Sequence, residues 1–120
     1  MTDLQMGAVE SRFADIIWQH EPITASALAK QSEEVFGWKK STTYTVLKRL
    51  CDKGLFQNQK GVVTSLISRE EFYALQSERF VEETFRGSLP AFLAAFTAKK
   101  KLTAEEVALL RRMVDEYKVE

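Results

Sequence analysis

The stretch KKSTTYTVLKRLCDKG, residues 39–54, decides the fold that this sequence predicts. On an α-helix, at about 100° per residue, its side chains separate into two faces. One face is apolar or small and collects Thr43, Val46, Leu47, Leu50 and Cys51. The opposite face is polar and collects Ser41, Thr42, Thr45, Lys48, Arg49 and Asp52. The pattern predicts a helix from Lys40 or Ser41 to Lys53, ended by Gly54, with one buried and one exposed face.

The positive charge of the chain is concentrated around this helix. The 120 residues carry no net charge, yet residues 39–60 hold six lysine and arginine residues against one aspartate, a net charge of +5. Residues 71–120 hold eight positive and nine negative residues, a net charge of −1. A basic cluster on a neutral chain indicates a surface that faces a polyanion. A solvated helix with a chance excess of lysine fits the same count, so charge alone leaves both interpretations open.

Two further helices are expected ahead of residue 39. Apolar residues recur every three or four positions across residues 6–20, which is typical of an amphipathic helix, and Thr2 with a glutamine three residues later suits its start. Pro22 ends this helix, because the residue before a proline is disfavoured in the helical region. Thr24 is a suitable N-cap for a second helix, and Gly37 is a suitable stop.

The sequence after Gly54 changes to short β-forming runs. LFQNQ (55–59) and VVTSLI (62–67) flank Lys60-Gly61, and this arrangement predicts a β-hairpin. Two strands alone are only marginally stable, so we expect the hairpin to pack on the helices.

The remainder of the sequence predicts a helical tail. Capping boxes at Ser68 and Thr103 begin two helices, and a short apolar segment, residues 88–98, lies between them. The order helix, helix, helix, hairpin and helical tail predicts a mainly α protein. We expect a winged helix-turn-helix DNA-binding domain over residues 1–69 and a helical dimerisation region over residues 70–120.

The tail is richer in apolar side chains than so short a region can bury alone. We expect a second copy of the chain to cover these side chains in a homodimer. The alternative is that they fold back on the winged helix. The expected dimerisation residues are Phe72, Phe80, Phe85, Phe92, Phe96, Val107, Leu110, Val114 and Tyr117.

The polar face of the third helix carries the residue types that suit a DNA major groove. Arginine presents a fork to guanine, and threonine offers a hydroxyl and a methyl group to thymine. Lysine side chains and a helix N-terminus hold phosphates. Asp52 follows Lys48 by one helical turn, so we expect the two to pair. The predicted DNA-binding residues are Lys39, Lys40, Ser41, Thr42, Tyr44, Thr45, Lys48, Arg49 and Lys60.

The expected roles differ within this set. The candidates for base edges are Ser41, Thr42, Thr45 and Arg49, and those for phosphates are Lys39, Lys40, Lys48 and Lys60. Lys60 is placed at the tip of the hairpin, the wing. Tyr44 lies at the border of the two faces, where it either touches DNA or packs on the wing.

The sequence shows no pattern typical of an enzyme, a metal site or a cofactor site. It has no glycine-rich phosphate loop, no metal-spaced cluster of cysteine and histidine, and no Ser/His/Asp signature. Cys51 is interpreted as a small buried hydrophobe, and His20 as a cap at the end of the first helix. With one cysteine, no signal segment and no apolar run near the ~18 residues of a membrane span, a cytoplasmic protein is expected.

The chain resembles the penicillinase-repressor family, which includes the methicillin-resistance repressors and the copper-responsive repressors. The matching parts are ESRFADIIW (10–18), Trp38, KKSTTYTVLKRL (39–50), Lys53-Gly54, FRGS (85–88) and LTAEEVALLRRM (102–113). The resemblance covers nearly the whole chain. It implies a homodimeric repressor that binds double-stranded DNA at an inverted-repeat operator and blocks transcription.

Three features of the sequence depart from the family pattern. Members that respond to β-lactams are cut at an Asn-Phe bond in the tail, and Ala95-Phe96 stands at the corresponding place here. Copper-responsive members carry Cys-x-Cys motifs near the C-terminus, whereas this tail has no cysteine. Val62 replaces the arginine expected after the wing glycine.

Two alternatives from other classes remain open on the sequence. A winged-helix module could dock an acidic protein surface and never touch nucleic acid. A ligand-gated regulator could hold an effector in the apolar tail, in a cavity between the fourth helix and the segment around Phe92.

Overall fold

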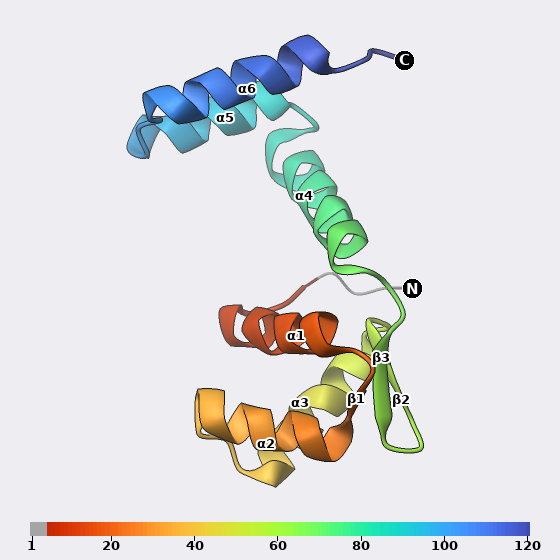
Figure 1. Ribbon diagram of the computed structural model, residues 1–120. Coiled ribbons are helices and arrows are strands. Elements are labelled where there is room, and N and C mark those ends of the chain that lie inside the picture. The colour runs from red at the N-terminus through yellow and green to blue at the C-terminus, as the bar shows by residue number, and fades with distance from the viewer. Residues whose placement is uncertain (1–4) are drawn as a thin grey trace. The chain divides into compact units, whose positions relative to one another are not determined.

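The computed structural model describes residues 5–120, and the chain divides into two compact units. We call the part up to Ser77 the N-terminal unit and Glu78–Glu120 the C-terminal unit. The elements are α1 (Ala8–His20), β1 (Ile23–Thr24), α2 (Ala25–Phe36), α3 (Lys40–Asp52), β2 (Phe56–Gln59), β3 (Val62–Ser65), α4 (Arg69–Phe85), α5 (Leu89–Lys99) and α6 (Ala104–Glu116) (Figure 1). The mainly α, winged helix-turn-helix fold that the sequence predicts is confirmed. The cap expected at Thr2 lies outside the described residues.

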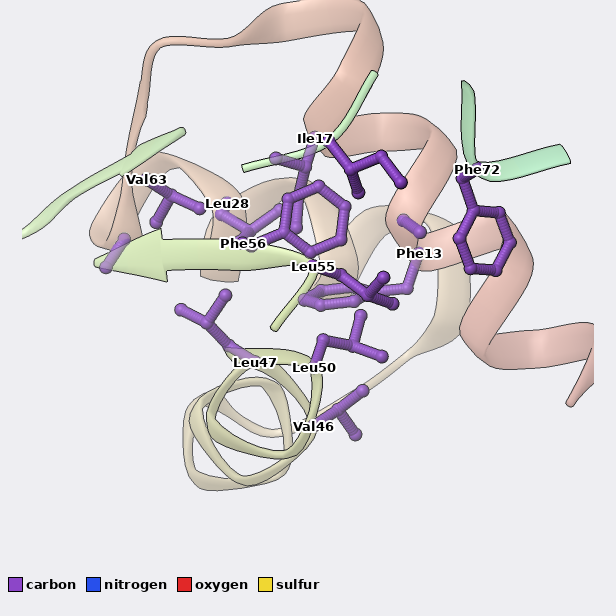
Figure 2. Close-up of a cluster of buried hydrophobic side chains, with 13 residues drawn as sticks. Phe13, Ile17, Leu28, Val46, Leu47, Leu50, Leu55, Phe56, Val63 and Phe72 are labelled. Atoms are coloured by element: carbon purple, nitrogen blue, oxygen red, sulfur yellow. The ribbon is translucent and has the colours of Figure 1, made fainter. Parts of the chain in front are cut away.

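One hydrophobic core holds the N-terminal unit together. It takes side chains from α1, α2, α3, the sheet and the first turn of α4, including Phe13, Ile17, Leu28, Leu47, Leu50, Leu55, Phe56, Val63 and Phe72 (Figure 2). Trp18, at the edge of the core, connects α1 to the segment that follows β3, because its Nε1–H donates to the Ile67 carbonyl at 3.0 Å. Burial of this apolar surface is the main force that fixes the orientation of α3.

The wing is the hairpin of β2 and β3, and β1 joins it in a three-stranded antiparallel sheet in the order β1-β3-β2. Lys60 and Gly61 at its tip have φ of 53° and 82°, which is the pattern of a tight hairpin turn with two left-handed residues. The sequence predicts β2 and β3 but not β1, whose two residues are too few for a periodic signal. β1 pairs Ile23 with Val63, and the Ala25 N–H donates to the Gly61 carbonyl at 2.8 Å. The wing is thereby joined to the start of α2.

The helix ends follow local signals, with small shifts. α1 begins at Ala8 rather than Met6, after Gly7, whose N–H donates to Glu10 Oε1 at 3.2 Å. The Thr24 Oγ1 accepts the Ala27 N–H at 3.1 Å, and Gly37 closes α2 in the left-handed region. Both of these match the prediction.

α4 and α6 begin at the predicted caps, and α5 occupies the predicted apolar segment with a cap at Ser88 that was not among the predictions. Ser68 caps α4, Ser88 caps α5, and Thr103 forms a reciprocal capping box with Glu106 before α6. Within the C-terminal unit, the rings of Phe80, Phe85, Phe92 and Phe96 form a chain of contacts with centroids 5.6–6.0 Å apart. None of the described helices is long and apolar enough to cross a membrane. In residues 5–120 no group of three or more His, Cys, Asp or Glu side chains is placed to hold a metal ion.

Candidate nucleic-acid interface

The polar face of α3 (Ser41, Thr42, Thr45, Lys48, Arg49 and Asp52) is exposed to solvent along its whole length. The opposite face packs into the core of the N-terminal unit, where Thr43 and Leu50 are fully buried. Figure 2 shows Val46, Leu47 and Leu50 directed from α3 into that core. The two-faced helix predicted from the sequence is confirmed, and its polar side chains are available to a partner.

The beginning of α3 is suited to bind an anion. Lys39 precedes the helix with an extended backbone and supplies no side-chain cap. A helix N-terminus of this kind carries partial positive charge and presents unsatisfied N–H groups. Lys40 adds a full charge at the first helical position, and its Nζ lies 5.8 Å from the ring centroid of Tyr44. Charge, helix dipole and exposed N–H groups together suit a phosphate.

The middle of α3 presents one hydroxyl and one exchangeable cation. The Thr45 hydroxyl donates to the Ser41 carbonyl at 2.9 Å, so its oxygen keeps its acceptor capacity and its methyl group remains for an apolar contact. Lys48 Nζ lies 3.2 Å from Asp52 Oδ2, which is the predicted pair. Both side chains are well exposed, and pairs of this kind contribute little to stability. Lys48 can therefore exchange Asp52 for a phosphate at small cost.

Arg49 has a partner that the sequence pattern does not indicate. Its Nη1 lies 3.8 Å from Oε2 of Glu10 on α1. Lys53 Nζ lies 3.7 Å from the other oxygen of Glu10 and also donates to the Gln5 carbonyl. The only sequence signal for this contact is the glutamate that opens the stretch matching the family, ESRFADIIW.

The wing offers one cation. Lys60 is exposed at the turn, as predicted, on a different element from α3. Val62 next to the turn is exposed and apolar. The wing of this chain is therefore suited to a single charge contact with a nearby phosphate.

Cys51 lies at the edge of the core and has no sign of reactivity. Burial raises the pKa of the Cys51 thiol, the charge of neighbouring Asp52 raises that pKa further, and Lys48 lowers it. The thiol therefore stays protonated at neutral pH, which agrees with the interpretation of Cys51 as a small hydrophobe.

The apolar residues of the tail are largely uncovered in the single chain. Among the described residues of α5 and α6 none is buried. Phe80 and Phe96 are about half exposed, and Val114 and Tyr117 are more than 70 % exposed. Phe85, Phe92, Val107 and Leu110 are partly covered. An open apolar hollow of about 260 Å³ lies along α6, lined by Leu102, Val107, Leu110, Arg111, Val114 and Asp115.

Phe72 differs from the other expected dimerisation residues. Its side chain is fully buried in the N-terminal unit, with its ring centroid 5.6 Å from that of Trp18. No surface of this ring remains for a second copy of the chain, so its expected role is corrected to a core residue. The same contact places the first half of α4 in the N-terminal unit, which extends to Ser77 rather than Arg69.

Comparison with known proteins identifies the family. The sequence profile of the family described as penicillinase repressor matches residues 6–116. The chain belongs to this family. Members of the penicillinase-repressor family are transcriptional regulators and not enzymes, and the resemblance noted in the sequence is confirmed.

Two individual relatives agree with this assignment. The chain is 25 % identical over 118 residues to the penicillinase repressor of Bacillus licheniformis, across 95 % of this chain and 92 % of that protein. It is also similar to the solution structure of the DNA-binding domain of the repressor BlaI, with a TM-score of 0.54 and 26 % identity. That match covers 59 % of this chain and 93 % of the domain, as expected for a winged helix that is one part of a longer family member.

Proposed function

We propose that this protein is a transcriptional repressor that acts as a homodimer on an inverted-repeat operator in the cytoplasm. The observation that carries the proposal is the polar face of α3, exposed along its length while the opposite face is anchored in the core. The two relatives, a penicillinase repressor and the DNA-binding domain of a repressor, support the same function.

In the proposed complex α3 lies in the major groove. Ser41, Thr42 and Thr45 face base edges near the start of the helix, where side chains are short and the backbone comes close to DNA. Arg49 reaches a guanine one turn further along. Phosphates on either side are held by Lys39, Lys40, Lys48 and Lys60, with Tyr44 beside the first of these contacts.

The C-terminal unit supports the proposed homodimer. A region in which α5 and α6 bury no described residue gains little stability alone, and a second copy would cover Phe80, Phe92, Phe96 and the apolar side of α6. Two recognition helices related by a two-fold axis would read two half-sites about 34 Å apart, or a multiple of that distance. A dimer bound across a promoter would exclude RNA polymerase.

A titration of the full chain with labelled duplex DNA tests this function. We expect measurable binding to random-sequence duplex at low salt, and a linear fall of log affinity with log salt as counterions are displaced. We further expect the chain to enrich an inverted repeat from a random duplex pool. A chain that binds neither duplex at low salt, and binds an acidic protein surface instead, would be an interaction module and not a repressor.

A further inference from the structure

The carboxylate of Glu10 on α1 lies against the two cations at the end of α3. Its Oε2 is 3.8 Å from Arg49 Nη1, and its Oε1 is 3.7 Å from Lys53 Nζ. The Gly7 N–H donates to Oε1 at 3.2 Å and fixes the carboxylate at the first turn of α1. The Glu10 side chain is only 19 % exposed, so solvent screens its charge weakly.

The two cations are held to different degrees. The Lys53 side chain is only 17 % exposed and also donates to the Gln5 carbonyl, so two partners hold it in place. The Arg49 side chain is 55 % exposed, and at 3.8 Å it is attracted by Glu10 without a direct hydrogen bond. Glu10 Oε2 is buried and has no hydrogen-bond partner in the described structure, so it remains an acceptor directed at Arg49.

We propose that Glu10 is a positioning residue that sets DNA specificity by restraining Arg49. The proposal rests on the proposed DNA-binding function. Glu10 lowers the positive potential that Arg49 offers to any phosphate, and it keeps the guanidinium near α1. Arg49 then leaves Glu10 only for an acceptor with better geometry, such as the paired acceptors of a guanine edge. The expected effect is discrimination against non-specific DNA.

The test uses two probes and an isosteric variant. The probes are the duplex that the wild-type protein selects from a random pool and a scrambled duplex of the same base composition, each titrated by fluorescence anisotropy. For Glu10→Gln we expect about threefold tighter binding to the scrambled duplex, because the pair with Arg49 is half open to solvent and of modest strength. The salt slope should steepen by up to ~0.9, because Arg49 is released to contact one more phosphate. The ratio of selected to scrambled affinity should fall.

Two controls separate this role from charge and from folding. Glu33→Gln removes the same charge from an exposed position of α2 and should leave the ratio unchanged. In an Arg49→Ala background, Glu10→Gln should have no further effect on the scrambled duplex, because Glu10 acts through Arg49. If Glu10 only supported the fold, Glu10→Gln would change the affinity for the scrambled duplex equally in the wild-type and the Arg49→Ala proteins.

A second measurement does not depend on the folding of the Glu10 variant. If Glu10 neutralises Arg49 toward phosphate, Arg49→Ala should weaken binding to the selected duplex but leave the scrambled affinity within about twofold of wild type. Lys48→Ala, in contrast, should weaken both duplexes.

The possible outcomes are distinct. The inference is overturned if Arg49→Ala weakens the scrambled duplex as much as Lys48→Ala does, or if a folded Glu10→Gln protein keeps the wild-type ratio and salt slope. In those cases wild-type DNA binding stands and only the role of Glu10 is lost. If wild type binds neither duplex at low salt, the proposed function fails as well.

Discussion

Individual side chains on α3 differ in how firmly the protein holds them, and this difference decides their proposed roles. Thr45 is bound to the backbone of its own helix, Lys48 is loosely paired with Asp52, and Arg49 is attracted by Glu10 from another helix. A side chain with a weak, exposed partner can exchange it for a phosphate, whereas one restrained by a buried carboxylate requires a better acceptor.

Lys48→Ala tests the phosphate role at the residue scale. The change removes one charge contact, so affinity for every duplex should fall and the salt slope should flatten by about 0.9. Anisotropy titrations over a range of salt concentrations measure both quantities. Lys118→Ala, which removes an exposed lysine beyond the end of α6, should leave the slope as in wild type. Equal effects of the two substitutions would contradict the assignment of Lys48.

At the scale of elements, local patterns predict α3 and the hairpin well, because both signals lie within a few residues. The two faces of α3 follow from helical period alone, and the wing from two β-forming runs around Lys60-Gly61. β1 and the contact between Glu10 and Arg49 could not be predicted in this way. Each joins segments far apart in the sequence, and neither leaves a periodic pattern in either segment.

α4 belongs to both units, and the sequence does not indicate where along the helix the first unit ends. Phe72 and Phe80 lie on one helix and have the same residue type, yet Phe72 is fully buried in the N-terminal unit and Phe80 is half exposed. The sequence gives no sign of which unit covers a given phenylalanine. Only the packing on Trp18 distinguishes them.

Phe72→Ala tests this correction. Loss of a fully buried phenylalanine removes apolar contacts and leaves a cavity, so the free energy of unfolding should fall by about 3–5 kcal/mol. Thermal or urea unfolding monitored by circular dichroism measures the change. Phe96→Ala, on α5, should leave the unfolding of the N-terminal unit unchanged. A Phe72→Ala protein as stable as wild type would mean that Phe72 is not a core residue.

For the whole molecule, the central question is how a chain without net charge would bind DNA as the proposed homodimer. The basic cluster at residues 39–60 supplies the local attraction, and the uncovered C-terminal unit supplies the proposed pairing. The proposed DNA-binding surface and the proposed pairing surface lie in different compact units. A substitution in one unit need not disturb the fold of the other unit.

Val114→Asp tests the pairing. Val114 is 73 % exposed in the single chain but lines the apolar hollow of α6, so a buried charge there should disfavour a dimer. We expect the protein to shift from dimer to monomer in sedimentation velocity and to lose affinity for an inverted repeat. Val35→Asp, at an exposed position of α2, is the matched control and should remain dimeric. A wild-type chain that sediments as a monomer at all concentrations would contradict the homodimer.

The most direct measurement of the central claim is the affinity of Thr45→Glu for duplex DNA. The new carboxylate would stand in the middle of the polar face of α3, and like charge against the groove costs several kcal/mol, so binding should weaken by more than about tenfold at low salt. Ser77→Glu is the matched control: this exposed hydroxyl on α4 also donates to a nearby carbonyl, and its replacement should bind DNA as wild type does. A folded Thr45→Glu protein with wild-type affinity would show that the exposed side of α3 does not lie against DNA.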